Sequence, residues 1–291
     1  MPYVAMLDIL KTARKGKYAV GAFNIVNELT ARAAILAAEQ TASPMILQTS
    51  VATVKHFGII PLMNILKPMA MAASVPVAIH LDHCTDEKMV MDAIDAGWSS
   101  VMFDGSKLAF SENIAITKRI VDYSLDKKVT VEGEVGAIVG VEDDIHVLGS
   151  EAALATIDSC LEFIKRTGVN VLAPAIGTAH GLYTDEPNIR YSLLADIVKK
   201  TNIPIVIHGG TGLKEAEFKR LILTGASKIN ISTAIKIAYC RGMGEYTSQN
   251  PDESNPIKLD SFCLNNVKKV ILDHITIFGS DNKIPKELKR I

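Results

Sequence analysis

Three polar residues at the end of one apolar segment have side chains that bind metals or transfer protons. The segment 77–84 begins after Pro76 with apolar residues and then reaches His80, Asp82 and His83. A short apolar stretch of this kind predicts a buried strand. In α/β folds, active sites lie at the carboxyl ends of such strands. A buried, hydrogen-bonded histidine is the commoner explanation for one such residue, so the segment needs support from elsewhere in the chain.

Two further histidines follow predicted strands in the same way. His180 lies in the glycine-spaced stretch 177–181, and His208 ends the apolar stretch 204–208. Three imidazoles with an open fourth position form a common catalytic zinc environment. His83, His180 and His208 each adjoin Gly or Asp at a predicted strand end. Their combination therefore favours three ligands of one zinc ion over three unrelated structural histidines.

Two loops have the composition of phosphate-binding segments. Residues 208–212 read His-Gly-Gly-Thr-Gly before a predicted helix, and residues 230–233 read Asn-Ile-Ser-Thr before another. Glycines let backbone amides approach a phosphate closely, and a helix N-terminus adds positive potential. In barrels, the loops after the seventh and eighth strands are the recurrent phosphate site. Turn formation explains either loop alone, whereas both together favour phosphate binding.

Acidic residues at other predicted strand ends suit two roles. Glu132 and Glu134 are two residues apart on a predicted strand and so share one side of it. Asp104 and Glu134 are candidates for a second metal site or for orienting the histidines. Glu142 lies in 136–149, which we expect to be a long loop that closes over the site and brings a base with it. An ordinary solvated acid is the alternative for Glu142.

The elements that must position these residues alternate regularly between strand and helix. The strands are apolar throughout, which is typical of a parallel sheet covered by helices. We therefore expect an α/β fold, a (β/α)8 TIM barrel with extra terminal helices, as a single domain over residues 1–291. A doubly wound sheet fits less well, because no GxGxxG follows the first strand and polar strand ends recur along the whole chain. The predicted strands are 18–24, 44–50, 77–82, 100–104, 129–134, 169–173, 204–208 and 228–231, and the predicted helices are 5–15, 28–39, 61–73, 86–96, 112–125, 151–167, 191–200, 215–223, one from 233, and 261–278.

Composition excludes several classes of function. A net charge of -1 without a basic tail argues against nucleic-acid binding. The four cysteines have no CxxC spacing, which favours a reduced cytoplasmic protein. The N-terminus lacks the pattern of a signal peptide, and no apolar run approaches the roughly 20 residues of a membrane span. We expect a cytoplasmic protein that acts without a membrane.

Taken in order, the motifs resemble those of the class II, metal-dependent ketose-bisphosphate aldolases, the fructose-/tagatose-1,6-bisphosphate group. The resemblance extends over nearly the full length of the chain. Several ordered motifs at family-like spacing are far more specific than any one of them. The segments that carry the resemblance are 80–84 (His-Leu-Asp-His-Cys), 131–136 (Val-Glu-Gly-Glu-Val-Gly), 140–144 (Gly-Val-Glu-Asp-Asp), 177–181 (Gly-Thr-Ala-His-Gly), 208–212 and 230–233.

The resemblance implies reversible cleavage of a ketose 1,6-bisphosphate to dihydroxyacetone phosphate and glyceraldehyde 3-phosphate in a homodimer or homotetramer. It implies that Zn2+ binds the three histidines, that Asp82 handles the proton on the C4 oxygen, and that Glu142 exchanges the proton on dihydroxyacetone phosphate. Asp104 and Glu134 would match a second, non-catalytic metal position. A monovalent cation, Na+ or K+, would bind backbone atoms near residues 179, 181, 209 and 211. The predicted substrate-binding residues are Asn24, Ser50, Gly181, Gly209, Gly210, Thr211, Asn230, Ser232 and Thr233.

The chain departs from the family pattern at two places. Ser232 stands where fructose enzymes often have an acidic or Asn residue and tagatose enzymes often have Ala, although residues 234–236 resemble the tagatose type. Asn255-Pro256-Ile257-Lys258 stands where relatives often have Asp-Pro-Arg, so Lys258 is the candidate partner for the second phosphate. Another ketose phosphate derived from dihydroxyacetone phosphate, a barrel metallohydrolase and a non-catalytic partner subunit are the alternative functions.

Overall fold

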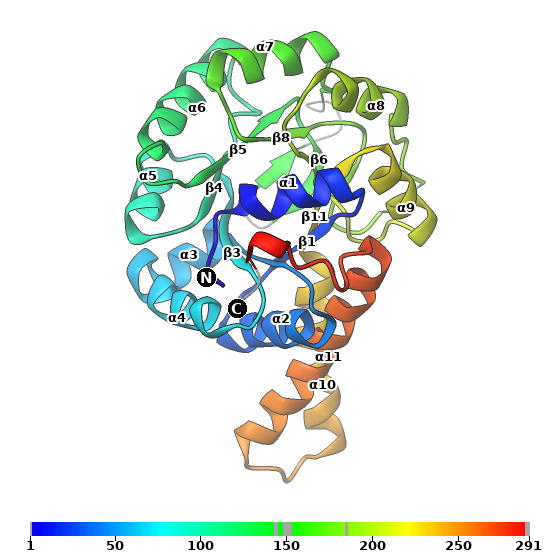
Figure 1. Cartoon of the computed structure of the whole chain (residues 1–291). Coiled ribbons are helices and arrows are strands. Elements are labelled where there is room, and N and C mark those ends of the chain that lie inside the picture. The colour runs from blue at the N-terminus through cyan, green and yellow to red at the C-terminus, as the bar shows by residue number, and fades with distance from the viewer. Residues whose placement is uncertain (1, 143–144, 148–152, 184–185, 289–291) are drawn as a thin grey trace.

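Eight parallel strands form a closed barrel in the computed structural model, which describes residues 2–142, 145–147, 153–183 and 186–288 (Figure 1). The strands follow one another around the ring in the order β1-β11-β10-β8-β5-β4-β3-β2. This confirms the predicted (β/α)8 barrel. The barrel strands are β1 (Val20–Asn24), β2 (Met45–Ser50), β3 (Val77–Cys84), β4 (Ser100–Phe103), β5 (Thr130–Val135), β8 (Val171–Pro174), β10 (Ile205–Ile207) and β11 (Ala226–Ile231).

Helices surround the barrel, and the last two long ones form a hairpin that projects from it in Figure 1. This hairpin, α10–α11, and the N-terminal α1 are the extra terminal helices expected from the sequence. None of the helices in the described part of the chain has the length and apolar composition needed to cross a membrane. The helices are α1 (Met6–Gly16), α2 (Glu28–Thr41), α3 (Val51–Phe57), α4 (Ile59–Ala72), α5 (Glu87–Ala96), α6 (Phe110–Ser124), α7 (Ile157–Thr167), α8 (Tyr191–Lys200), α9 (Glu215–Thr224), α10 (Thr233–Gln249) and α11 (Pro256–Phe278), with a 3-10 turn, η1 (Lys286–Leu288).

Several boundaries differ from the sequence expectation, and capping explains most of them. The predicted helix 61–73 is preceded by an unpredicted helix, α3, whose first turn is capped by the Ser50 hydroxyl. The predicted helix 151–167 begins only at Ile157, because Thr156 and Ser159 form a capping box there. Residues 151–152 lie outside the described part of the chain. The last helix begins earlier than expected, at Pro256, where Asn255 accepts a bond from the Ile257 amide.

The predicted long loop 136–149 contains two short strands, which is a correction. β6 (Val139–Glu142) pairs antiparallel with β7 (Ile145–Val147) and parallel with β9 (Ala179–His180). These three strands form a separate small sheet. Residues 143–144 and 148–152 lie outside the described part of the chain. The β9 backbone comes from a distant part of the sequence, so local composition could not reveal this pairing.

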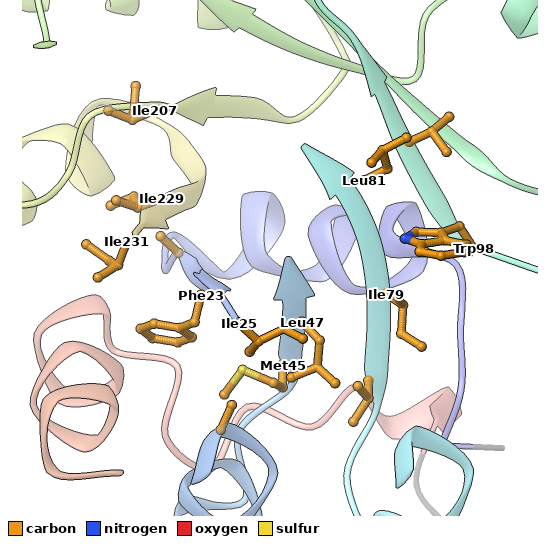
Figure 2. Close-up of a cluster of buried hydrophobic side chains, with 14 of the residues drawn as sticks. Phe23, Ile25, Met45, Leu47, Ile79, Leu81, Trp98, Ile207, Ile229 and Ile231 are labelled. Carbon is orange, nitrogen blue, oxygen red and sulfur yellow. The ribbon is translucent and has the colours of Figure 1, made fainter. Parts of the chain in front are cut away.

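The main core lies between the outer face of the barrel and its helices. Phe23, Leu47, Ile79 and Ile229 point outward from their strands and are fully buried (Figure 2). Trp98 packs in the same cluster, and its indole N–H donates to Thr49 Oγ1 at 3.1 Å. Because successive residues of a strand face opposite sides, the alternate residues must fill the barrel interior.

The barrel interior is mostly apolar at the amino ends of the strands and becomes more polar toward their carboxyl ends. α1 covers the amino-terminal opening and packs Met6, Ile9 and Leu10 against a second cluster. Two residues after the cluster members Ala22, Ile46, Ala78 and Val206, the chain carries Asn24, Gln48, His80 and His208. The interior members of the second cluster are Val20, Ala22, Ile46, Ala78, Val171, Ala173 and Val206. The histidines and most of the carboxylate and amide side chains of the interior therefore lie toward the carboxyl end of the barrel, where the sequence predicted the site.

Candidate active site and metal centre

A bulge in β3 brings two consecutive residues to the same cavity. On a regular strand, Asp82 and His83 would face opposite sides. His83 instead has a positive φ of 47°, and the pairing of β3 with β4 shifts register between Leu81 and Cys84. A non-glycine residue in the left-handed region is uncommon and marks local strain at functional sites. The bulge lets the Asp82 carboxylate and the His83 imidazole both reach the mouth of the barrel.

The three histidines predicted as zinc ligands converge there. One nitrogen each of His83, His180 and His208 lies within 4.8 Å of the other two. His83 Nε2 and His208 Nδ1 are 2.6 Å apart, and the His83 and His180 rings meet edge to face with centroids 4.8 Å apart. All three side chains are buried. These histidines come from β3, β9 and the end of β10, which are far apart in sequence, so only the fold brings them together.

Charges around the three rings favour a positive charge between them. Burial lowers the pKa of His208 and His180 well below the usual value, and the neighbouring His83 lowers it further. Burial also acts against protonation of His83, but Asp82, Asp104 and Glu134 outweigh it and raise the pKa of His83 well above the usual value. His180 and His208 are thus kept neutral, as metal ligands must be, and the carboxylates around His83 attract positive charge to the same point.

A buried carboxylate fixes the tautomer of His208. Glu132 Oε1 accepts a hydrogen bond from His208 Nε2 at 2.8 Å, so the lone pair of His208 lies on Nδ1, which points toward His83. The other oxygen, Glu132 Oε2, accepts from Lys228 Nζ at 2.9 Å. All three side chains are fully buried. Carboxylates that hold metal-bound histidines in this way are a recurrent part of zinc sites.

Asp104 fixes the orientation of the His83 ring, as Glu132 fixes that of His208. Asp104 Oδ2 accepts from His83 Nδ1 at 2.8 Å, which leaves His83 Nε2 directed at the other histidines. Glu134 Oε2 lies 3.9 Å from the same His83 nitrogen and has no hydrogen-bond partner among the described residues. Burial and the nearby Asp104 raise the pKa of Glu134 well above the usual value. His83, Asp104 and Glu134 thus form a second group that has the spacing of a metal site, and two of its members are the residues proposed from the sequence for a second metal.

Three amides hold the Asp82 carboxylate. Gln48 Nε2 donates to Asp82 Oδ2 at 2.9 Å, and Asn24 Nδ2 donates to the same oxygen at 3.2 Å. Asn230 Nδ2 donates to Asp82 Oδ1 at 3.3 Å and also contacts His208 Nδ1 at 3.2 Å. Asp82 is only 1% exposed. The carboxylate is therefore fixed beside the histidines by residues from three different strands.

The two predicted phosphate loops lie side by side. The Ala234 amide at the start of α10 donates to Thr211 Oγ1 at 3.4 Å, and the Gly210 amide donates to the Asn230 carbonyl at 3.2 Å. Gly209 has a φ of +70°, and a Cβ there would lie 2.2 Å from the Ala179 carbonyl oxygen. The glycine at 209 is thus required by the close approach of the segment that carries His180.

The other predicted substrate residues border this region. Thr211 and Ser232 are almost fully buried, and Ser232 Oγ has no hydrogen-bond partner among the described residues. Thr233 is the first residue of α10, and Gly181 follows β9 with a φ of +86°. Ser50 lies at the end of β2, where its hydroxyl caps α3. The structure therefore brings these residues to the carboxyl end of the barrel, around the histidines.

Two predicted residues need separate comment. The backbone of Glu142 ends β6 and pairs with Ile145. The side chain of Glu142 is outside the part that the structure describes. Lys258 lies in the first turn of α11, where its ammonium pairs with Glu253 Oε2 at 2.6 Å. Lys258 is therefore a surface residue engaged on the projecting hairpin.

Sequence reasoning missed the positioning residues. The sequence places Lys228 and Gln48 within predicted strands but indicates no role for either side chain. For Glu132 it indicates only which side of its strand the side chain occupies. Each occupies an alternate position within an apolar strand, which was the available signal. Tyr183 was missed as well: its hydroxyl donates to the Gly209 carbonyl at 2.7 Å and accepts from the Ala179 amide at 3.0 Å. It ties the His180 segment to the glycine loop.

Comparisons with known proteins agree with this geometry. The family model for class II fructose-bisphosphate aldolase matches residues 4–283. A fructose-bisphosphate aldolase of Geobacillus stearothermophilus is 39% identical over 97% of this chain and 99% of its own length. A sulfofructosephosphate aldolase of Alkalicoccus urumqiensis is 37% identical over 97% and 99%.

Solved structures give the same result. A crystal structure from Coccidioides immitis has a TM-score of 0.90 at 28% identity, covering 96% of this chain and 97% of that one. The YdjI aldolase of Escherichia coli K12 has a TM-score of 0.84 at 30% identity, covering 97% and 100%. The three converging histidines fit the metal site on which class II aldolases depend. The chain therefore belongs to the class II fructose-bisphosphate aldolase family and is a lyase.

Proposed function

We propose that this protein is a zinc-dependent aldolase that reversibly cleaves a ketose 1,6-bisphosphate, fructose or tagatose 1,6-bisphosphate, to dihydroxyacetone phosphate and glyceraldehyde 3-phosphate. The observation that carries the proposal is the arrangement of His83, His180 and His208 beside the Asp82 carboxylate at the mouth of the barrel. The adjacent glycine loop at 209–212 supports a phosphorylated substrate.

His83, His180 and His208 would hold the zinc ion, with Glu132 and Asp104 fixing two of the rings. When bound, zinc supplies a Lewis acid that polarises the ketose carbonyl and so favours breaking the C3–C4 bond. Asp82 takes the proton from the C4 hydroxyl, and its three amide donors keep the carboxylate in one orientation for that transfer.

Glu142 supplies the second proton transfer. It donates a proton to the carbon of the dihydroxyacetone phosphate half that carried the broken bond, and removes this proton in the synthetic direction. Its strand β6 pairs with β9, the strand that carries His180. Movement of the paired strands β6 and β7 would therefore be linked to the metal site. Closure of these strands over the site would exclude water during the proton transfer.

The near phosphate would bind at the paired loops after β10 and β11. The residues we propose for the dihydroxyacetone phosphate half are Asn24, Ser50, Gly181, Gly209, Gly210, Thr211, Asn230, Ser232 and Thr233. A monovalent cation, Na+ or K+, at the backbone near Ala179 and Gly209 would add positive charge there; these two residues approach closely. We keep the homodimer or homotetramer, the cytoplasmic location and the second metal at Asp104 and Glu134 as predictions.

A second candidate substrate is another ketose 1-phosphate with a different aldehyde half. The 37% identical relative named sulfofructosephosphate aldolase favours this possibility. The two substrates share the half that yields dihydroxyacetone phosphate and differ only at the far end. The same histidines and loops therefore serve both, and the choice depends on residues around the aldehyde half.

The test is a coupled cleavage assay with fructose and tagatose 1,6-bisphosphates, with and without a chelator. We expect cleavage that the chelator abolishes and added zinc restores, and the ratio of kcat/KM for the two epimers identifies the preferred sugar. Cleavage that persists in protein shown to be free of metal would contradict the zinc mechanism. Release of inorganic phosphate without an aldehyde product would identify a hydrolase instead.

A separate test addresses Glu142. We expect Glu142→Ala to slow exchange of the dihydroxyacetone phosphate proton with solvent by about 100-fold, which is within the range of a lost general base, while zinc content stays at the wild-type level. The matched control is Asp143→Asn, the next acid in the sequence. Loss of zinc from Glu142→Ala, or equal slowing in the control, would contradict the proposed role.

A further inference from the structure

One tyrosine hydroxyl bonds to the backbone beside two of the three histidines of the candidate metal site. Tyr183 Oη accepts a hydrogen bond from the Ala179 amide at 3.0 Å and donates one to the Gly209 carbonyl at 2.7 Å. Ala179 directly precedes His180, and Gly209 directly follows His208. A hydroxyl can donate and accept at the same time, so this group joins the two histidine-bearing segments.

The ring of Tyr183 contacts the far end of the glycine loop 208–212. A Cβ added at Gly212 would lie 3.3 Å from Tyr183 Cδ2, and Gly212 has a φ of +96°. The ring is partly buried and packs against the main core. The hydroxyl and the ring of one side chain therefore contact both the first and the last glycine of the loop that we propose for the near phosphate.

The bridge through Tyr183 is stable near neutral pH. Burial raises the pKa of Tyr183 to about 12, so the hydroxyl keeps its proton. A phenolate could not donate to the Gly209 carbonyl, whereas the neutral hydroxyl can. The two hydrogen bonds are therefore both available over the neutral pH range.

The two segments that Tyr183 joins are held differently by the fold. His208 follows β10, which has the barrel strands β8 and β11 as neighbours on its two sides. His180 lies in β9, a strand of two residues that pairs with β6 in the small sheet. A strand this short has few backbone bonds, and such segments open more easily than core strands. The bond from the Ala179 amide to Tyr183 thus attaches the His180 segment to the barrel.

The peptide unit between Gly209 and Gly210 transmits changes in the loop to Tyr183. A peptide unit is planar, so its carbonyl and its amide move together. The carbonyl accepts from Tyr183, and the amide donates to the Asn230 carbonyl at 3.2 Å. An anion that fixes the glycine loop therefore also fixes the Tyr183 hydroxyl and, through it, the Ala179 amide.

We propose that Tyr183 is a positioning residue that couples anion binding in the glycine loop to metal binding at the three histidines. The inference rests on the proposed aldolase function and adds regulation of the same site. A phosphate group in the loop raises the affinity for the metal, because it holds the His180 segment in the position that the other two histidines require. The metal must raise the affinity for the phosphate group by the same factor.

The test measures zinc affinity by competition with a coloured chelator, with and without saturating methyl phosphate. Methyl phosphate carries the phosphate group of the substrate without its carbonyl and hydroxyl groups. We expect it to raise zinc affinity about tenfold in the wild type and about threefold in Tyr183→Phe, which lacks only the bridging hydroxyl. The remaining threefold is direct attraction between the anion and the cation, which is the same in both proteins and which salt screens.

The ratio of the two zinc affinities separates coupling from a merely structural role. A structural role would lower zinc affinity equally with and without methyl phosphate and leave the ratio unchanged. A ratio in Tyr183→Phe within twofold of the wild-type ratio would therefore overturn the inference, as would a wild-type ratio below two. The affinity for methyl phosphate with and without zinc gives a second measurement of the same ratio.

The matched control is Tyr191→Phe. Tyr191 is a partly buried tyrosine at the start of α8, and the guanidinium carbon of Arg220 lies 3.9 Å from the centre of its ring. We expect this variant to keep the wild-type ratio. An equal fall of the ratio in Tyr191→Phe would show that the effect does not depend on the bridge and would overturn the inference. Urea unfolding of each metal-free variant checks that the fold is retained.

These outcomes differ from failure of the proposed function itself. If wild-type protein binds no zinc at the histidines and cleaves no ketose phosphate, the aldolase proposal is wrong and the coupling falls with it. If wild-type protein binds zinc and cleaves a ketose bisphosphate while methyl phosphate leaves its zinc affinity unchanged, the aldolase proposal stands and the coupling through Tyr183 is wrong.

Discussion

Glu132→Gln is the substitution that best tests the histidine site, because it keeps the size of a fully buried side chain and removes its charge. Glu132 accepts from His208 Nε2 at 2.8 Å and from Lys228 Nζ at 2.9 Å. A glutamine can accept only one of these bonds with its single oxygen. Loss of a carboxylate that orients a metal-bound histidine typically reduces metal affinity by about 10- to 100-fold, or about 1.4 to 2.7 kcal/mol.

The same substitution should also destabilise the metal-free fold, for a different reason. Lys228 is fully buried, and Glu132→Gln leaves its ammonium without the carboxylate that balances it. Breaking one side of a buried ion pair costs about 3 to 5 kcal/mol. The double variant Glu132→Gln/Lys228→Met removes both charges, so it should recover much of this stability. It should not recover zinc affinity, since His208 still lacks its carboxylate.

The assays are competition with a coloured zinc chelator and urea unfolding of the metal-free protein. We expect zinc affinity and the free energy of unfolding both to fall in Glu132→Gln. In Glu132→Gln/Lys228→Met, only the free energy of unfolding should recover. Zinc affinity within threefold of wild type in Glu132→Gln would refute the orienting role. A double variant no more stable than the single one would refute the charge-balance argument.

The remaining predictions concern backbone geometry and pH. Gly209→Ala should weaken zinc binding, because its Cβ would lie 2.2 Å from the carbonyl oxygen of Ala179, next to His180. Gly244→Ala is the control, because a Cβ at this position in α10 would meet nothing within 4 Å. This control should stabilise the protein by up to about 1 kcal/mol. Burial lowers the pKa of His274, so the unfolded chain binds its proton more readily and stability falls as pH drops below the usual histidine pKa. His274→Phe should lessen the loss of unfolding free energy between about pH 7.5 and about pH 5.5, and an unchanged loss would contradict this.

The sequence predicted the barrel because its strands are apolar on both faces and are separated by helical segments. It also predicted the histidine cluster, since strand ends converge in a barrel whatever the loop details. His180 is the one ligand candidate of the three that belongs to β9 in the small second sheet and to no barrel strand. Its position depends on the pairing of β9 with β6, which no local pattern encodes.

What the sequence could not give are the contacts between strands. The positive φ at His83, the Glu132–Lys228 pair and the three amides around Asp82 all depend on how distant strands align. A glutamate or lysine within an apolar strand shows that a buried partner must exist, but it does not identify that partner. The identity of the partner required the register of the closed barrel.

Ring closure has a consequence for synthesis of the chain. β1 pairs with β2 on one side and with β11 on the other, and these pairings join residues 20–24 to residues 226–231. While the ribosome makes the intervening residues, one edge of β1 has no native neighbour and is open to pairing with other chains. Native closure becomes possible only after β11 has left the exit tunnel, so nascent chains truncated before residue 226 should be prone to aggregation.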